Sequence, residues 1–545
     1  MSEPRTTPFW STAALLRDST YHRQRRIHIS KSLQSFIFSI GPATADIPSL
    51  AAAILTMPPV TTPDNPEEFA RLRTTDPGLP RPNPTPAYWQ HIPHPLANAR
   101  SERLPSQRDY AIIGSGITGL SVARTLLESH PSVTVSVLEA RSLCSGATGR
   151  NGGQMAINAG EEYSHLAEAF GPKMAGEIVM FTLRNLRGMQ VLAEEYDAVE
   201  TSEVQQLTKL RIFMTNDKLE AFKQSIARFE ADHPALKGMY TLIDASTLRK
   251  EHGIHEASGG ALLPAGTVWP YRLVTKVFET LLKRFPDRLT VETNTPVTAI
   301  EMHDSSAAAN SAHAYSVQTP RGSMTVGTVV YCTNGYSGHL LPALRGLIYP
   351  FKGTMTVQDP GTSMPNRGAA LSWGFHYPPT YDPATKRQMY GLYYLGQSAT
   401  TGYFYFGGEN KRIDDAVSAD DSFVATSSVD HLQSVLPRFF GKEEVHSSWN
   451  LVGSWSGIMG FTTDGLPLVG RLSSALTGRR GEGEWIAAGF NGYGMANCLL
   501  CGEALGRMML GHPTPEWLPG AYQVSEERLA KSASLSETKK TDSRL

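Results

Sequence analysis

Residues 109–154 read DYAIIGSGITGLSVARTLLESHPSVTVSVLEARSLCSGATGRNGGQ and decide the fold of this chain. An apolar run at 110–113 ends in Gly114-Ser-Gly116-Ile-Thr-Gly119, and a helical run and a second apolar strand, 133–138, follow it. Glu139 comes directly after that strand. This order of strand, Gly-x-Gly-x-x-Gly turn, helix, strand and acid predicts a site for an ADP-containing dinucleotide.

Each part of this unit has a chemical reason. Gly114 permits the tight turn, Gly116 lets the backbone approach a pyrophosphate, and Gly119 lets the helix pack close to the strand. The helix N-terminus offers free N–H groups and a partial positive charge to the phosphates. The Glu139 carboxylate can accept hydrogen bonds from ribose hydroxyls, which disfavours a 2′-phosphate. A lone glycine-rich turn is also a common plain loop, but the complete unit favours the dinucleotide site.

Length and composition indicate a globular protein of two or three domains, with 545 residues of which 41% are hydrophobic. The 50 basic and 51 acidic residues give a formal net charge of −1, which favours neither nucleic acid nor a membrane surface as a partner. The four cysteines are too few for a disulfide framework and indicate a reducing compartment. Cys498 and Cys501 form a C-x-x-C without a second pair, so we expect a buried helix face rather than zinc ligands.

Both ends of the chain carry signals outside the expected folded body. Residues 1–56 are more basic than acidic and resemble a transit peptide in composition. We expect a disordered extension there, with targeting, or translation from Met57, as the alternatives. Ser543-Arg544-Leu545 is a conservative variant of the Ser-Lys-Leu peroxisomal address. We therefore expect a peroxisomal import receptor as a partner, with cytoplasmic and mitochondrial locations as the alternatives.

Between these ends, a proline-rich lead-in at 57–107, anchored by Tyr88-Trp89, precedes alternating helices and strands. Gly489-Phe-Asn-Gly-Tyr-Gly494 follows a short strand and opens a helix through Met509. Two glycine-rich helix starts this far apart suggest one long cofactor held at both ends. The other predicted elements are helices at 161–196, 270–285 and 429–440, strands at 207–214, 289–302, 325–331, 390–395, 402–406 and 484–488, and a surface hairpin insertion at 305–314.

Five motifs in this chain resemble, in their order, those of the D-amino-acid-oxidase-like FAD oxidoreductases. The motifs are the unit at 109–139, GATGRNGGQ (146–154), VVYCTNGYS (329–337), GSWSGIMGFTTDGLPLVG (453–470) and AAGFNGYGMAN (487–497). GRNGGQ together with Trp-Ser-Gly most resembles the gamma-glutamylputrescine-oxidase-type branch.

The resemblance, over roughly residues 105–515, implies an α/β and α+β fold with two interleaved domains. A Rossmann-like FAD-binding domain is expected from the discontinuous segments 108–165, 290–345 and 450–515. A substrate domain on a mostly antiparallel sheet is expected from 166–289 and 346–449, and a flexible tail from 520–545.

The resemblance also implies which residues hold FAD. The first turn and Glu139 would hold the ADP half, the segment near Thr148 would pass the phosphates and flavin, and the turn at 489–494 would meet the flavin. The full set of expected FAD-binding residues is Gly114, Ser115, Gly116, Ile117, Thr118, Gly119, Glu139, Arg141, Thr148, Arg150, Asn151, Gly152, Gly153, Val297, Thr333, Asn334, Gly489, Phe490, Asn491, Gly492, Tyr493, Gly494 and Met495.

The substrate pocket is expected to be formed by the segments woven between these. Flavin accepts a hydride from a carbon next to a nitrogen, so the protein must orient that C–H bond and bind the amine in its neutral form. Core packing is the alternative for each aromatic candidate, and a solvated helix charge is the alternative for Arg272. The pocket candidates are Trp269, Tyr271, Arg272, Lys352, Tyr403, Tyr405, Trp455 and Met459.

Two departures from relatives affect the chemistry. Some relatives attach flavin to a cysteine in the region matching 458–461; this chain has none there, which predicts non-covalent FAD. Some place an oxygen-activating lysine on the strand matching 403–406, where this chain carries Tyr405. No metal site is expected.

These inferences lead to an FAD-dependent amine or amino-acid oxidase that makes an imine, with O₂ as the expected acceptor and H₂O₂ as the product. A dehydrogenase with another acceptor, a tailoring enzyme for a nitrogen-containing metabolite, and a non-catalytic flavin-binding scaffold are the alternatives.

Overall fold

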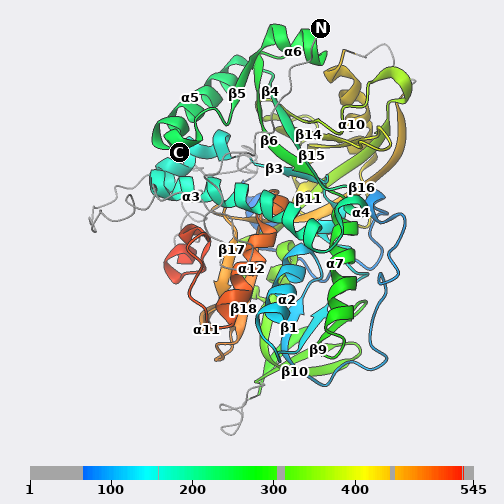
Figure 1. The fold of residues 1–545 in the computed structure, drawn as a ribbon, viewed down its shortest axis with the longest axis vertical. Coiled ribbons are helices and arrows are strands. Elements are labelled where there is room, and N and C mark those ends of the chain that lie inside the picture. The colour runs from blue at the N-terminus through cyan, green and yellow to red at the C-terminus, as the bar shows by residue number, and fades with distance from the viewer. Residues whose placement is uncertain (1–65, 158, 304–313, 442–448, 531, 533–545) are drawn as a thin grey trace, which may run out of the picture. The chain divides into compact units, whose positions relative to one another are not determined.

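Two β-sheets organise the protein, and each is assembled from widely separated parts of the chain (Figure 1). The computed structural model describes residues 66–157, 159–303, 314–441, 449–530 and 532, and all of them belong to one compact unit. The predicted extension at 1–56, nearly all of the insertion at 305–314 and the C-terminal Ser543-Arg544-Leu545 lie outside the described residues.

Sheet A has the strand order β17-β18-β10-β1-β2-β7, with β9 beside β10 and β8 beside β9. Its centre is parallel: β1 pairs with β2 and β10, β10 with β18, and β2 with β7. Apolar runs without alternation predict such strands, because helices cover both faces of a parallel sheet. The strand bounds are β1 Gln107–Ile113, β2 Val135–Leu138, β7 Leu289–Glu292, β8 Ala299–Met302, β9 Tyr315–Thr319, β10 Gly322–Tyr331, β17 Leu468–Arg471 and β18 Glu484–Ala488.

Sheet B has the order β16-β11-β15-β14-β12-β4-β6-β3, and β5 and β13 pair at its sides. Its pairs are antiparallel except for the parallel β4–β12 pair. A parallel Rossmann-like sheet and a second, mostly antiparallel sheet confirm the predicted fold class. The bounds are β3 Gln154–Ala156, β4 Gln205–Phe213, β5 Thr241–Asp244, β6 Gly259–Thr267, β11 Ile348–Asp359, β12 Leu371–His376, β13 Thr380–Asp382, β14 Arg387–Gln397, β15 Phe404–Arg412 and β16 Asn450–Thr462.

Helices lie against both sheets, and α3 contacts α5 on one side and α12 on the other (Figure 1). The predicted helix at 161–196 is α3, but Gly171, at φ +82°, and Pro172 break it. None of the described helices combines the length and the apolar character that a membrane span requires. The helices are α1 Pro66–Thr74, α2 Ile117–Ser129, α3 Ala159–Glu195, α4 Val199–Ser202, α5 Asn216–Asp232, α6 Ala245–His252, α7 Pro270–Arg284, α8 Ser337–Leu340, α9 Ile413–Ala416, α10 Thr426–Phe439, α11 Ser474–Thr477 and α12 Cys498–Met509.

Helices α2 and α12 pack side by side although most of the chain separates them (Figure 1). Small residues allow this approach: a Cβ atom on Gly502 would lie 2.6 Å from the Thr118 carbonyl oxygen. The Ser121 hydroxyl donates a hydrogen bond to the Leu499 carbonyl (2.6 Å). This close packing brings the N-termini of both helices to the same end of sheet A.

Three elements, β3, β16 and α7, lie with the other half of the protein than the predicted segments assign them to. β3 and β16 belong to sheet B, although the predicted FAD-binding segments 108–165 and 450–515 include them. α7, which falls in the predicted substrate segment, contacts α2 and β7 of the other half. The helix predicted to open at the turn 489–494 and to run through Met509 forms as the short 3-10 helix Gly494–Ala496 followed by α12.

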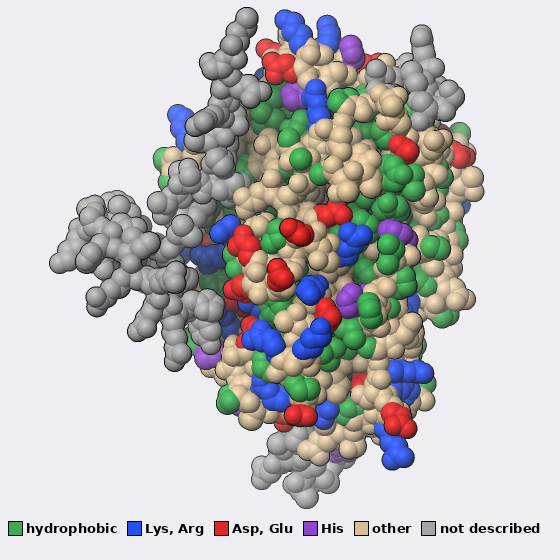
Figure 2. Space-filling view, turned by 45° about the vertical axis from the view of Figure 1, so that its right-hand side comes forward, with side chains coloured by type: hydrophobic (Ala, Val, Ile, Leu, Met, Phe, Trp, Pro, Cys, Tyr) green, Lys and Arg blue, Asp and Glu red, His purple; other side chains and the backbone are tan. Residues whose placement is uncertain are grey.

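The visible surface in Figure 2 carries acidic and basic side chains interspersed over the face drawn. This mixture agrees with the formal net charge of −1.

Candidate functional site

Three loops meet at the carboxyl edge of sheet A because β1, β2 and β10 run parallel. The Gly114 N–H donates to the Leu138 carbonyl (2.8 Å), and the Cys332 N–H donates to the Ile113 carbonyl (2.9 Å). Gly114 has φ +110°, and a Cβ atom there would lie 2.5 Å from the Cys332 carbonyl oxygen. Only glycine therefore fits this turn without strain.

Because Gly116 has no side chain, Thr148 can lie against the first turn of α2. A Cβ atom on Gly116 would lie 2.9 Å from the Thr148 hydroxyl, which accepts a hydrogen bond from the Ile117 N–H (3.1 Å). A Cβ atom on Gly119 would lie 2.0 Å from the Gly114 carbonyl oxygen. The glycine spacing thus sets both the turn and the helix-to-strand distance.

The Glu139 carboxylate is fixed by its neighbours. It accepts hydrogen bonds from the Ser115 N–H (3.1 Å) and hydroxyl (2.7 Å), and from the Arg141 N–H (3.0 Å). Only 8% of Glu139 is exposed. These bonds orient the carboxylate at the wall of the cavity described next, and its contact with a ribose stays a prediction.

One cavity runs from this edge of sheet A to the face of sheet B. It brings together all the predicted FAD-binding residues except Gly119, Gly153 and Gly489. Gly119 lies at the helix–strand contact instead, and Gly153, at φ +70°, lies against the Val268 carbonyl and the Trp89 ring. The predicted residues that line the cavity are Gly114, Ser115, Gly116, Ile117, Thr118, Glu139, Arg141, Thr148, Arg150, Asn151, Gly152, Val297, Thr333, Asn334, Phe490, Asn491, Gly492, Tyr493, Gly494 and Met495.

Gly489 itself does not line the cavity; it anchors the second glycine-rich turn. Its N–H donates to the Asn334 side-chain oxygen (3.1 Å). Asn491, at φ +52°, accepts from the Thr462 N–H (2.8 Å) and donates to the Gly489 carbonyl (2.7 Å). These bonds tie the turn to β16 and to the end of β10.

The N-terminal regions of α2 and α12 both border the cavity. From α3, the Asn185 amide donates to the Met495 carbonyl (3.0 Å) and accepts from the Leu500 N–H (3.0 Å). Helix N-termini carry partial positive charge, so two of them in one cavity favour an anionic ligand such as a pyrophosphate or a reduced flavin.

The end of the cavity on sheet B is polar. Lys209 and Arg211 are two residues apart on β4 and share a face, and His376 comes from the neighbouring strand β12. All three are buried, with 4%, 2% and 7% exposure. The Lys209 ammonium donates to the Gln154 side-chain oxygen (3.0 Å).

Glu161 balances part of this positive charge. Its carboxylate lies 3.1 Å from Arg211 Nη1 and 3.1 Å from His376 Nδ1. Burial would raise the pKa of Glu161, but His376 and Arg211 lower it to about 2. Burial lowers the pKa of His376, and the Glu161 charge opposes that change.

Burial also lowers the pKa of Lys209 to about 7, and the Arg211 charge acts in the same direction. Within the described part of the chain, Arg211 Nε, His376 Nε2 and Gln154 Nε2 are buried without a hydrogen-bond partner. Buried polar atoms are normally paired, so these atoms mark a place for a polar ligand group.

Of the eight pocket candidates, only Met459 lines the cavity. Trp269 and Tyr405 pack around the Trp89 ring, at centroid distances of 5.1 and 4.2 Å, and Tyr403 is partly buried against the same core. The Arg272 guanidinium lies over the Trp269 ring at 3.5 Å. These side chains form a packed aromatic cluster, which is the alternative that the sequence left open.

The other three candidates also have partners inside the protein. Tyr271 accepts a hydrogen bond from the His94 N–H (2.9 Å). Lys352 pairs with Asp415 at 2.5 Å, and the Trp455 indole donates to the Arg150 carbonyl (2.7 Å). None of the three lines the cavity, although Trp455 supports Arg150, which does.

Sequence reasoning missed several polar residues that line the cavity, among them Gln154, Lys209, Arg211, Tyr336, His339, His376 and Tyr394. One signal was available: Lys209 and Arg211 alternate with Leu210 and Ile212 on the predicted strand, and two buried cations on one face are costly without a role. It also missed a wall contributed by the lead-in, residues 78–80.

The cavity also contains two thiols, Cys332 and Cys498. Burial raises the pKa of the Cys332 thiol well above its ordinary value and that of Cys498 to about 12. Neutral thiols are poor nucleophiles, and non-covalent attachment of FAD stays a prediction. The described residues include no group of three or more His, Cys, Asp or Glu side chains arranged for a metal ion.

Comparisons with solved structures show the same fold. Glycine oxidase from Geobacillus kaustophilus is 17% identical, with a TM-score of 0.58 over 77% of this chain and 99% of that chain. L-proline dehydrogenase from P. horikoshii is 19% identical, with a TM-score of 0.57 over 77% and 97%. L-amino acid deaminase from Proteus vulgaris is 15% identical, with a TM-score of 0.56 over 80% and 99%.

A curated relative matches a short stretch only. The tRNA 5-methylaminomethyl-2-thiouridine biosynthesis bifunctional protein MnmC of Paracidovorax citrulli is 35% identical over 77 residues, which are 14% of this chain and 12% of that protein.

The site fits FAD on its own geometry. The cavity extends between two glycine-rich turns, and the N-termini of two helices border it. A side chain at position 116 would meet Thr148, so Gly116 keeps this part of the turn free of side-chain atoms. Residues 109–508 match the family described as FAD dependent oxidoreductase, and the chain is a member of that D-amino-acid-oxidase-type family and an FAD-dependent enzyme.

Proposed function

We propose that this FAD-dependent oxidoreductase oxidises the C–N bond of a carboxylate-bearing amine, an amino acid or an N-substituted amino acid, to an imine. The observation that carries the proposal is the polar end of the cavity. There Lys209, Arg211 and His376 lie together, and the donors of Lys209 and Arg211 are buried at the cavity, with Arg211 Nε lacking a protein partner. A carboxylate supplies the acceptors that these donors need.

The charges at this end favour one carboxylate. Arg211 is cationic, Lys209 has a pKa of about 7, and Glu161 is anionic beside them. Glu161 does not line the cavity, so the groups that face a ligand are mainly donors. A planar guanidinium matches a carboxylate in shape as well as charge.

The same cations prepare the substrate nitrogen. Oxidation removes a hydride from the carbon and a proton from the nitrogen, and a C=N bond forms between them. Bound FAD supplies the acceptor for the hydride. Lys209 and Arg211 disfavour a nearby ammonium group, so they increase the share of neutral amine, whose lone pair assists hydride loss.

The names of the similar structures support this substrate class. They include a glycine oxidase, an L-proline dehydrogenase and an L-amino acid deaminase. In our proposal O₂ accepts two electrons and two protons after each turnover and becomes H₂O₂. A dehydrogenase that uses another acceptor is the competing outcome of the experiment below.

Anaerobic bleaching of the flavin tests the proposal. The purified holoenzyme is mixed with a panel of amino acids and matched amines that lack the carboxylate, and the flavin absorbance near 450 nm is followed. We expect bleaching by at least one amino acid, no bleaching by its decarboxylated counterpart, and recovery in air with release of H₂O₂. Bleaching by amines alone would contradict the carboxylate site, and recovery only with a quinone would contradict O₂ as the acceptor.

A pair of variants connects the result to the polar end. Arg211→Met should lower kcat/KM for the active amino acid by about 100-fold or more, since it removes a charged hydrogen-bonding partner. Arg412→Met is the matched control, because Arg412 is half-exposed on the same sheet and pairs with Asp414 at the surface. If both variants keep wild-type kcat/KM, the assigned carboxylate site is wrong.

The peroxisomal location completes the proposal, because it would place an H₂O₂-forming enzyme in the compartment that handles peroxide. It is supported by Ser543-Arg544-Leu545 at the end of the chain, outside the described residues. A fluorescent protein carrying the last twelve residues should enter peroxisomes, and the same fusion without the final leucine should not. Diffuse signal from both fusions would refute the location.

A further inference from the structure

The segment before the family region passes over the FAD cavity. Residues 109–508 match the family, yet Gly78, Leu79 and Pro80 form part of the cavity wall. We propose that residues 76–90, named the strap, are part of the FAD site and retain the cofactor, with Asp421 as the positioning residue that holds the strap in place.

One end of the strap is fixed beside the cavity by an ion-pair cluster. The Asp76 carboxylate lies 3.0 Å from His339 Nδ1 and 2.7 Å from Arg345 Nη2. His339 itself lines the cavity. The Gly78 N–H donates to the same carboxylate (2.8 Å), so the anchor lies directly next to the wall residues.

The other end is fixed to the turn at 147–151, which borders the cavity. The Trp89 indole donates to the Asn151 carbonyl (2.5 Å), and the Gln90 amide donates to the Gly149 carbonyl (2.8 Å). A Cβ atom on Gly149 would lie 2.6 Å from that amide nitrogen. The strap and the turn therefore form one unit on this side of the cavity.

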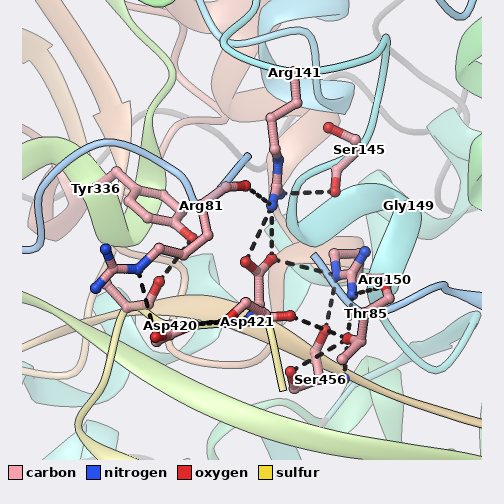
Figure 3. A network of polar contacts seen from close by, with 12 residues as sticks. Arg81, Thr85, Arg141, Ser145, Gly149, Arg150, Tyr336, Asp420, Asp421 and Ser456 are labelled. Atoms are coloured by element: carbon pink, nitrogen blue, oxygen red, sulfur yellow. Dashed lines mark hydrogen bonds and ion pairs between the residues drawn. The ribbon is translucent and has the colours of Figure 1, made fainter. Parts of the chain in front are cut away.

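Asp421 lies at the centre of the network in Figure 3 and is 1% exposed. Its carboxylate accepts hydrogen bonds from Arg141 Nη1 (2.9 and 3.1 Å) and lies 3.5 Å from Arg150 Nε. Both arginines line the cavity. One buried carboxylate thus neutralises part of two cationic charges and leaves the cluster of Asp421, Arg141 and Arg150 net positive, which favours an anionic group such as a pyrophosphate.

Asp421 and Thr85 connect this charge network to the strap. The Thr85 N–H (2.8 Å) and hydroxyl (3.1 Å) donate to the Asp421 carbonyl. The Thr85 hydroxyl accepts from Arg150 Nη2 (2.7 Å) and from the Ser456 N–H (3.0 Å), as Figure 3 shows. Since Arg150 contacts both the cavity and the strap, loss of the strap contact frees an arginine of the FAD site.

The consequence is reciprocal coupling between FAD and the strap. A cofactor that contacts Gly78–Pro80 stabilises the strap on the body, and an intact strap slows the departure of the cofactor. The strap is an element added before the family region, so relatives that lack it would hold FAD by the other walls alone.

The first experiment measures FAD release by the fluorescence of freed flavin after dilution of the holoenzyme. Thr85→Val keeps the shape of the side chain and removes its four hydroxyl hydrogen bonds, so we expect FAD to leave at least fivefold faster. Asp421→Asn should have a larger effect, tenfold or more, and Thr75→Val is the matched control because the Thr75 hydroxyl only donates to Arg71 at an exposed site. Release rates within twofold of wild type for both Thr85→Val and Asp421→Asn would overturn the proposal.

The second experiment needs no variant and stays informative if a variant fails to fold. Limited proteolysis of wild-type protein, with FAD and after its removal, is read by mass spectrometry at Arg81 and Tyr88. We expect FAD to slow cleavage in the strap at least tenfold while cleavage at the exposed Lys386 changes less than twofold. Equal cleavage of the strap with and without FAD would show that the strap has no part in cofactor retention.

Discussion

Replacing Lys209 with methionine should stabilise the protein below neutral pH and weaken the proposed carboxylate site. Burial, together with the Arg211 charge, lowers the pKa of Lys209 from 10.5 to about 7. The difference between these two values corresponds to roughly 5 kcal/mol against the charged form in the folded state. This cost is large for a side chain with no catalytic or binding purpose.

The sign follows from proton linkage. Below pH 7, Lys209 is protonated in both the folded and the unfolded protein, and the folded protein carries the full cost. Between pH 7 and 10.5 only the unfolded chain binds this proton, so the contribution to stability rises with pH. Above pH 10.5 the amine is neutral in both states and the cost is absent.

Lys209→Met removes this pH-dependent cost. It also leaves the Gln154 side-chain oxygen without a donor, because Lys209 Nζ lies 3.0 Å from that oxygen in the wild-type protein. An unpaired buried acceptor costs about 1–3 kcal/mol. The net gain at pH 6 is therefore about 2–4 kcal/mol, or roughly 2–4 °C in Tm for a chain of this size. At pH 10 the gain should vanish or turn into a small loss.

Thermal unfolding at pH 6, 8 and 10, with FAD at one fixed concentration, measures the effect. Lys283→Met is the matched control, since the Lys283 side chain is 70% exposed on α7. A Lys209→Met protein that is less stable than wild type at pH 6, or that gains the same Tm at every pH, would refute the reasoning.

Three further outcomes follow from the same structure. Gly114→Ala should destabilise the protein by about 3 kcal/mol and abolish tight FAD binding, because φ is +110° and the new Cβ atom meets a carbonyl oxygen. Gly453→Ala is the control, because open space surrounds that glycine, and it should change neither property. Thermal unfolding and FAD titration measure both variants. Benzoate, a carboxylate that the enzyme cannot oxidise, should bind more weakly as pH rises from 7 to 9, because Lys209 loses its proton. The affinity should fall by at most about tenfold per pH unit. Benzoate binding, followed by the flavin spectrum, that does not change with pH would contradict this. Gly502→Val should push α12 away from α2, because a Cβ atom at this position would lie 2.6 Å from the Thr118 carbonyl oxygen. We expect Tm to fall by several degrees and FAD binding to weaken. An unchanged Tm would show that the contact between the two helices is loose.

The ADP end of the site was predictable because its information is local. The turn from Gly114 to Gly119 and Glu139 lie within one strand–helix–strand unit, and the physical demands on each glycine can be read from spacing alone. The second turn at 489–494 was found for the same reason. Their joining in one cavity depends on the pairing of β10 with β18, which no local pattern contains.

The polar end was missed because sheet pairing creates it. Lys209 and His376 come from β4 and β12, which pair in parallel across a long stretch of sequence. The aromatic candidates Trp269 and Tyr405 do not line the cavity for a related reason: Trp89 of the lead-in packs against both rings. A lead-in without regular periodicity gives no signal that it returns to the core.

The order in which the walls of the cavity occur along the chain has a consequence for synthesis. The first wall appears at Gly114, but the turn at 489–494 and the start of α12 complete the cavity, and α12 packs directly on α2 (Figure 1). A ribosome-bound chain therefore exposes the apolar side of α2 until almost the whole sequence has emerged. The cavity is therefore complete only after translation of α12, although its first wall, at Gly114, is made early.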